Sequence, residues 1–77
     1  MEINVLFFGE ISGLTGVFQK HYRSVSSFSD LLHRIEDDFP EIIHYPFRIA
    51  VNNQIINNEP ELNCGDEVAF LPPFYGD

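Results

Sequence analysis

Hydrophobic and polar residues alternate near both ends of the chain and recur with a helical period between them. The opening strand, predicted over residues 2–8, has apolar side chains on both faces. Ile3 and Val5 share one face, and Leu6 and Phe8 share the other. A strand that is apolar on both faces is typical of the centre of a sheet, or of a sheet whose second face meets a partner.

The clearest element is a helix that the apolar spacing predicts between residues 28 and 39. Its side chains recur at i, i+3, i+4, i+7 and i+11, which places them on one face. This stripe consists of Phe28, Leu31, Leu32, Ile35 and Phe39. Ser26 or Ser27 can cap the start, and Pro40 prevents continuation. The acidic run 36–38 near its end is interpreted as a solvated face, with a basic partner as the alternative.

The remaining pattern predicts four further strands. They cover residues 17–23, 47–52, 54–56 and 67–71. The glycine-rich stretch 9–16 predicts a plain loop, because its spacing matches no phosphate-binding fingerprint. Asn52-Asn53 tolerates positive φ and predicts a tight turn, and Gly65-Asp66 predicts the last turn.

The order strand, strand, helix, strand, short strand, strand predicts an α+β fold in a single domain over residues 1–77. One helix packed on one face of a mixed sheet satisfies this order. The opposite face then keeps apolar side chains without a helix to cover them, which is typical of a protein interface. Loops folded over this face are the alternative. The predicted partner-binding residues are Leu6, Phe8, Ile55, Ala69 and Leu71.

Charge and composition exclude several classes of function. Twelve acidic residues against four basic ones give a net charge of −8, which disfavours nucleic acid and anionic membranes and favours basic proteins. The apolar N-terminal run is too short to span a membrane. Cys64 is the single cysteine and the three histidines fall in different elements, so we expect no metal site, no catalytic residues and a cytoplasmic location.

The last six residues, 72–77, predict an extended tail. Pro72 and Pro73 fix φ and donate no hydrogen bonds, so the chain leaves the sheet stiff and extended. Phe74 and Tyr75 add apolar bulk, and Gly76 lets the backbone pass through a narrow channel. This combination predicts insertion into the active site of another protein, with the C-terminal carboxylate as the reactive group.

The chain resembles the small subunit of molybdopterin synthase, a sulfur carrier with the ubiquitin-like β-grasp fold. The resemblance covers nearly the whole sequence. It rests on VLFFGEI (5–11), AVNNQII (50–56), GDEVAFLPP (65–73) and the glycine at 76. The block close to the C-terminus is the most specific of these motifs.

The resemblance implies a non-catalytic carrier subunit of a two-subunit transferase. An E1-like adenylating enzyme is expected to use ATP to activate the terminal carboxylate, which then receives sulfur as a thiocarboxylate. The tail is expected to enter the large synthase subunit and give up sulfur for dithiolene formation in molybdenum cofactor biosynthesis. No cofactor is expected on the chain itself. Phe8, Ile55 and Leu71 are expected to contact the large subunit and the activating enzyme in turn.

The family ends in Gly-Gly, whereas this chain has Gly76 followed by Asp77. Asp77 adds a Cβ and a charge at the position that reacts. Three interpretations stay open. Asp77 is tolerated or trimmed, so that Asp77 or Gly76 carries the sulfur; or the domain is a docking or regulatory module that accepts none; or it is a sulfur carrier for thiamine, cysteine or tRNA thiolation. Pro72-Pro73 favours the molybdopterin branch.

Overall fold

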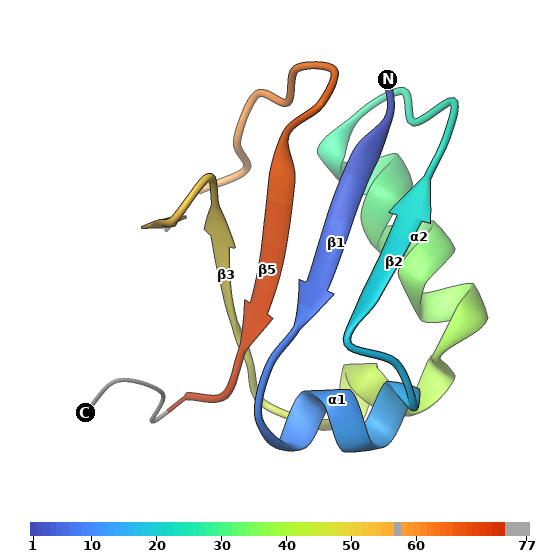
Figure 1. Cartoon of the computed structure of the whole chain (residues 1–77), viewed down its shortest axis with the longest axis vertical. Helices are drawn as coiled ribbons and strands as arrows, with labels where there is room; N and C mark the ends of the chain where they lie inside the picture. Colours follow the sequence, from blue (N-terminus) through green and yellow to red (C-terminus); the bar gives the residue numbers. More distant parts are fainter. Residues whose placement is uncertain (57, 74–77) are drawn as a thin grey trace.

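A five-stranded mixed sheet forms the centre of the protein (Figure 1). The structure is a computed structural model, and it describes residues 1–56 and 58–73. The strand order is β2-β1-β5-β3-β4; β1 and β5 are parallel and the other neighbours are antiparallel. The strands are β1 (Ile3–Phe7), β2 (Gln19–Tyr22), β3 (Arg48–Val51), β4 (Gln54–Ile55) and β5 (Glu67–Leu71). This arrangement confirms the predicted α+β fold with a mixed sheet.

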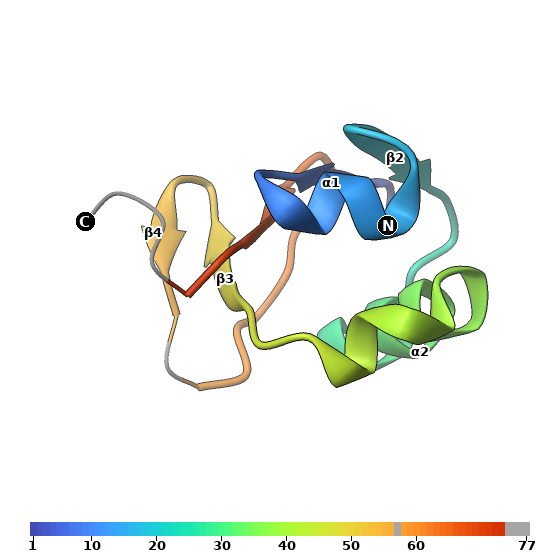
Figure 2. The ribbon, with the colours of Figure 1, turned by 90° about the horizontal axis from the view of Figure 1, so that it is seen from below.

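The main helix, α2 (Phe28–Asp38), packs against one face of the sheet (Figure 2). Ser27, one of the two predicted caps, caps the helix by accepting a hydrogen bond from the Asp30 backbone N–H. The Asp30 carboxylate in turn accepts from the Ser26 backbone N–H. Beyond the helix, Pro40 begins a 3₁₀ helix, η1 (Pro40–His44), which the sequence pattern did not predict.

A short helix, α1 (Glu10–Thr15), occupies the stretch that was predicted to be a plain loop, so that prediction was wrong. Ile11 is fully buried and anchors the helix against the core. Gly9 enters with φ of 55°, and Gly16 ends the helix in the left-handed region while its N–H donates to the Ser12 carbonyl. Buried area at a single side chain therefore outweighs the weak helix propensity of a glycine-rich segment.

The core lies between the sheet and α2. Phe7, on β1, has its ring centroid 5.5 Å from that of Phe39 and 5.6 Å from that of Phe70. Phe47 approaches Phe70 at 5.0 Å from the other side. These aromatic contacts tie β1, β5 and the segments that flank η1 into one cluster. The fully buried side chains are Phe7, Phe70, Ile3, Ile11, Leu31, Ile35, Ile42, Val5, Val25 and Val68.

Two asparagines form the turn between β3 and β4, as predicted. Asn52 and Asn53 have φ of 50° and 71°. The Asn52 side chain also accepts a hydrogen bond from the Glu67 backbone N–H at 3.0 Å and donates to the Asp66 carboxylate at 3.1 Å. The turn is thereby fixed to the start of β5. The predicted turn at Gly65 is also present, with φ of 89°.

Candidate functional site

The face of the sheet opposite α2, which we call the outer face, carries a continuous apolar row. The register places Leu6 beside Ala69, Ala69 beside Ala50, and Ala50 beside Ile55. The row therefore crosses β1, β5, β3 and β4 without a charged side chain. A second row follows toward the C-terminal ends of β1 and β5, where Leu71 pairs with Arg48.

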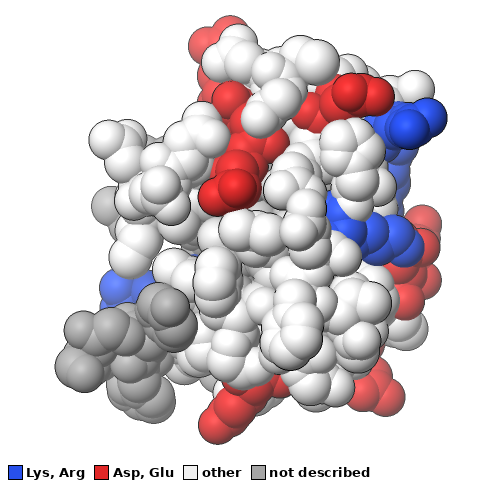
Figure 3. Space-filling model, viewed as in Figure 1, with Lys and Arg blue, Asp and Glu red and all other residues white. Residues whose placement is uncertain are grey.

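No helix of the described chain covers the outer face (Figure 1), and its lower centre is uncharged, with acidic side chains above it and basic ones toward the right (Figure 3). Leu6, Ala69 and Leu71 are half-buried, and Ile55 is 53% exposed. Ala50 is 5% exposed yet lies outside the main hydrophobic cluster, as expected for a small side chain set between larger neighbours on the outer face. The structure therefore brings Leu6, Ala69, Leu71 and Ile55 together on one face of the sheet, and the role of this face in binding stays a prediction.

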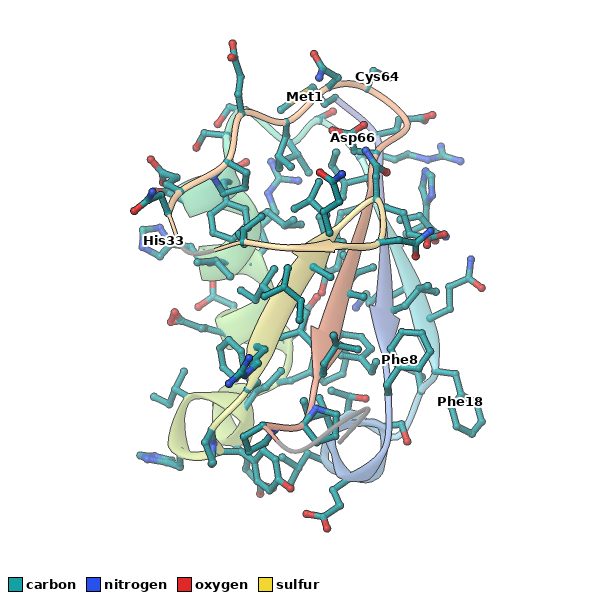
Figure 4. The ribbon with its side chains drawn as sticks, turned by 90° about the vertical axis from the view of Figure 1, so that its left-hand side faces the viewer. Met1, Phe8, Phe18, His33, Cys64 and Asp66 are labelled. Atoms are coloured by element: carbon teal, nitrogen blue, oxygen red, sulfur yellow. The ribbon has the colours of Figure 1, made fainter. Side chains whose placement is uncertain are left out.

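Phe18 extends this apolar surface at the β2 edge and was not predicted. The sequence pattern placed residue 18 inside a strand, where alternation would turn it into the core with Tyr22. Instead β2 begins at Gln19, and the Phe18 carbonyl accepts from the Phe7 N–H at 2.8 Å. The Phe18 side chain is 78% exposed and points to the same side as Phe8, away from α2 (Figure 4). The signal in the sequence for an exposed Phe18 was its position two residues after Gly16, the glycine that ends α1.

The base of the tail lies where β1 and β5 end together. The two strands are parallel, so Phe8 and Pro72 follow the same edge of the sheet, and the Phe8 N–H donates to the Phe70 carbonyl at 3.1 Å. A Cβ built on Gly9 would lie 2.7 Å from Pro72 Cγ, so the absence of a side chain lets Pro72 sit there. Pro72 and Pro73 are half-buried. Phe74, Tyr75, Gly76 and Asp77 lie outside the described residues.

A charged cluster away from the outer face joins the end of α2 to β2. The Lys20 ammonium lies 2.8 Å from the Asp38 carboxylate, which also accepts from the Tyr22 hydroxyl at 2.8 Å. Hydrogen bonds from Lys20 and then Tyr22 lower the pKa of Asp38, while burial and the same carboxylate raise the pKa of Tyr22. The last acid of the run 36–38 is thus tied to β2, which corrects the expectation of a purely solvated face.

The described residues contain no group of three or more histidine, cysteine or acidic side chains able to hold a metal ion. His33 is exposed on α2 and Cys64 is exposed in the loop before β5 (Figure 4). An open hollow of about 610 Å³ lies between α2 and the β3–β4 edge, with mainly apolar walls that include Leu32, Phe47 and Ile49. No helix within the described ranges is long and apolar enough to cross a membrane.

Comparison with models of known protein families identifies the family of this chain. The model of the ThiS family matches residues 5–76, which is nearly the whole chain. The protein belongs to the ThiS family. It is thus a ThiS-like protein with the ubiquitin-like β-grasp fold of the sulfur carriers.

Solved structures share this fold over their full length. A proposed molybdopterin converting factor subunit 1 from Pyrococcus furiosus superposes with a TM-score of 0.82 at 22% identity, over 95% of this chain and 98% of that one. Subunit 1 in the complex of subunits 1 and 2 of the Helicobacter pylori factor gives 0.77 at 24%, over all of both chains. The small archaeal modifier protein 1 of Methanosarcina acetivorans gives 0.81 at 21%, over 99% and 96%.

Proposed function

We propose that this ThiS-family chain is a sulfur carrier that serves as the small subunit of a molybdopterin synthase. The observation that carries the proposal is the uncovered apolar row of the outer face, which borders the base of the tail. A partner seated on this face receives the tail that leaves β5 at Pro72. Exposed apolar surface of this kind is typical of a protein interface.

A large synthase subunit is the partner that we infer. The Helicobacter pylori relative is a complex of subunits 1 and 2 of its molybdopterin-converting factor, and its fold matches this chain over its whole length. The proposed contact residues are Leu6, Phe8, Ile55, Ala69 and Leu71. The same face would serve an E1-like activating enzyme at a different stage, so the two partners compete for it.

The reaction is assigned to the tail and the partners. The activating enzyme joins the α-carboxylate at the end of the mature tail to the AMP part of ATP, with release of pyrophosphate. A sulfide-level donor then attacks the acyl carbon and displaces AMP together with one carboxylate oxygen, which leaves a thiocarboxylate on Gly76 or Asp77. Residues 72–75 thread the tail into the large subunit, which supplies the catalytic groups for dithiolene formation. This chain supplies no catalytic residue and binds no cofactor of its own. Because activation needs ATP, we place the protein in the cytoplasm.

Intact-mass spectrometry tests the carrier function directly. The protein is incubated with ATP, the activating enzyme and a sulfur donor, and we expect a species in which one oxygen is replaced by sulfur. Fragmentation assigns that sulfur to Gly76 or Asp77. The Asp77→Gly variant is the matched comparison, and we expect it to accept sulfur faster because it lacks the added charge and Cβ. A chain that stays unmodified while Asp77→Gly reacts would make the native protein a docking module.

A sulfur carrier of another pathway is the second candidate. It is favoured by the match to the ThiS family as a whole and by the fold shared with small archaeal modifier protein 1. Mixing the thiocarboxylate form with the large subunit and a pyranopterin precursor separates the two. Sulfur lost from the carrier together with dithiolene product supports the synthase, whereas a carrier that keeps its sulfur supports the other pathway.

A further inference from the structure

Arg48 differs from the other lysine and arginine side chains because it has no ionic partner among the described residues. Lys20 pairs with Asp38 at 2.8 Å, Arg34 with Asp30 at 3.1 Å, and Arg23 lies 3.7 Å from Glu2. Within residues 1–56 and 58–73, Arg48 makes no such contact, although acids outnumber bases three to one in the chain.

By strand alternation Arg48 belongs to the outer face, but it lies where β3 extends beyond its pairing with β4, and it also lines the hollow between α2 and the β3–β4 edge. It alternates along β3 with Ile49, which packs against the core, and it pairs with Leu71 of β5. Its neighbour two residues along, Ala50, belongs to the apolar row. Arg48 therefore stands beside that row, at the end of β5 from which the tail departs. Arg48 is exposed, so its guanidinium is hydrated in the free protein.

Nearby acids are held by other groups. Glu59 lines the same hollow as Arg48, but its carboxylate accepts a hydrogen bond from the Ser29 hydroxyl. Glu67 lies at the opposite end of β5, where it pairs with Asn4. The free side chain of Arg48 thus leaves its five donors available to a group from outside the described chain.

Docking would remove water from this guanidinium. A charge that is buried without compensation is costly, so a partner that covers the outer face must provide a counter-charge there. The planar guanidinium matches a carboxylate through two parallel hydrogen bonds. We propose that Arg48 is a specificity-determining docking residue, which binds a carboxylate that the large subunit presents beside the apolar row. This inference rests on the proposed docking of the outer face.

Charge-reversal variants with equal net charge provide the test. Arg48→Glu and Arg23→Glu each take the chain from −8 to −10, so both change long-range steering equally. Arg23 is a suitable control because its side chain is 80% exposed and it directly follows β2, the strand at the far side of the sheet from β3. We expect Arg48→Glu to weaken binding to the large subunit about 30-fold or more, as is typical when one partner of a covered charge pair is lost. Arg23→Glu should stay within about threefold, as rim charges do.

Circular dichroism and thermal unfolding establish that each variant is folded before its affinity is measured. Arg48→Met removes the charge while keeping the apolar stem, and it decides the matter if Arg48→Glu does not fold. Equal affinity losses for Arg48→Glu and Arg23→Glu, or wild-type affinity for Arg48→Met, would overturn the inference while leaving the carrier function intact. A wild-type chain that does not bind the large subunit would overturn the docking proposal itself.

Arg48→Lys identifies the chemistry of the partner group. A carbodiimide joins a lysine amine to a carboxylate in direct contact, forming an amide as the carbodiimide takes up the water that is lost. We expect a cross-link from residue 48 to an Asp or Glu of the large subunit, and none from Arg23→Lys. A folded, binding Arg48→Lys variant without this cross-link would refute the carboxylate assignment.

Discussion

Removing Asp38 should destabilise the fold, because this carboxylate joins the last turn of α2 to the edge strand β2. It accepts hydrogen bonds from the Tyr22 hydroxyl and the Lys20 ammonium, both at 2.8 Å. The ammonium also lies 5.4 Å and 5.2 Å from the ring centroids of Tyr22 and Phe39. In Asp38→Ala, the Tyr22 hydroxyl loses its acceptor at a residue that is only 6% exposed.

The expected loss follows from these two contacts. A hydrogen bond to a charged group contributes about 1.5–3 kcal/mol. An exposed ion pair adds only about 0.2–1 kcal/mol, and the Lys20 and Asp38 side chains are 40% and 38% exposed. Taking the low end for this accessible site, we expect Asp38→Ala to lower the free energy of unfolding by about 2 kcal/mol. For a domain of this size that corresponds to a decrease in Tm of roughly 8–16 °C.

Urea and thermal unfolding followed by far-UV circular dichroism would measure this loss. Asp37→Ala is the matched control, because it removes a neighbouring exposed acid and should change stability by less than about 0.5 kcal/mol. Asp38→Asn keeps an acceptor for Tyr22 without the charge, so its loss should be about 1 kcal/mol. Equal stability of Asp38→Ala and Asp37→Ala would refute the reasoning.

The pH dependence gives an independent check. The pKa of Asp38 is lowered by Lys20 and then Tyr22, so the stabilisation is present above the ordinary aspartate pKa and is lost as pH falls through the folded value. The gap between wild type and Asp38→Ala should therefore close below about pH 4. The pKa of Tyr22 is raised, chiefly by burial, so its neutral form stabilises the fold below about pH 10 and that stabilisation is lost at higher pH.

Three further predictions concern the outer face and the turns. Leu71→Lys should leave Tm within a few degrees of wild type but weaken binding to the large subunit at least about tenfold in calorimetry, since it places a second positive charge opposite Arg48 on the outer face; unfolding instead would mean that Leu71 belongs to the core. Asn52→Ala should cost about 1–2 kcal/mol in urea unfolding, and Asn52→Gly less, because glycine retains the positive φ and loses only the side-chain bonds; equal losses would show that φ is unimportant there. Cys64→Ser should leave sulfur acceptance unchanged, since Cys64 is exposed in a loop and no basic residue adjoins it in the sequence to favour its thiolate. A large decrease would reveal a role for the thiol.

Strand alternation predicted most of the sheet because it depends on local geometry. Successive side chains of a strand point to opposite faces, so residues 2–8 and 67–71 indicated both the core face and the outer face before any pairing was known. The positive φ of Asn52 was likewise predictable, since asparagine tolerates this conformation. The family resemblance added the ubiquitin-like β-grasp fold and an expected destination for the tail, which periodicity alone does not specify.

Helix α1 and the exposure of Phe18 depended on tertiary contacts. A glycine-rich segment reads as a loop locally, and it becomes helical because Ile11 finds a place in the core that the rest of the fold creates. Phe18 precedes β2, which begins at Gln19, two residues after the predicted start, and its side chain is exposed.

The sequence by itself determined the apolar composition of the outer face and the positions of the turns, both of which follow from residue type and spacing, and the chemistry of the tail stays a prediction. Only the tertiary structure decided which residues meet across strands. Leu6, Ala69, Ala50 and Ile55 come from four strands, and their continuity is a consequence of register. The lack of an ionic partner for Arg48 among the described residues is also a tertiary result, because whether a charge has a partner depends on distances in space, which separation along the chain does not fix.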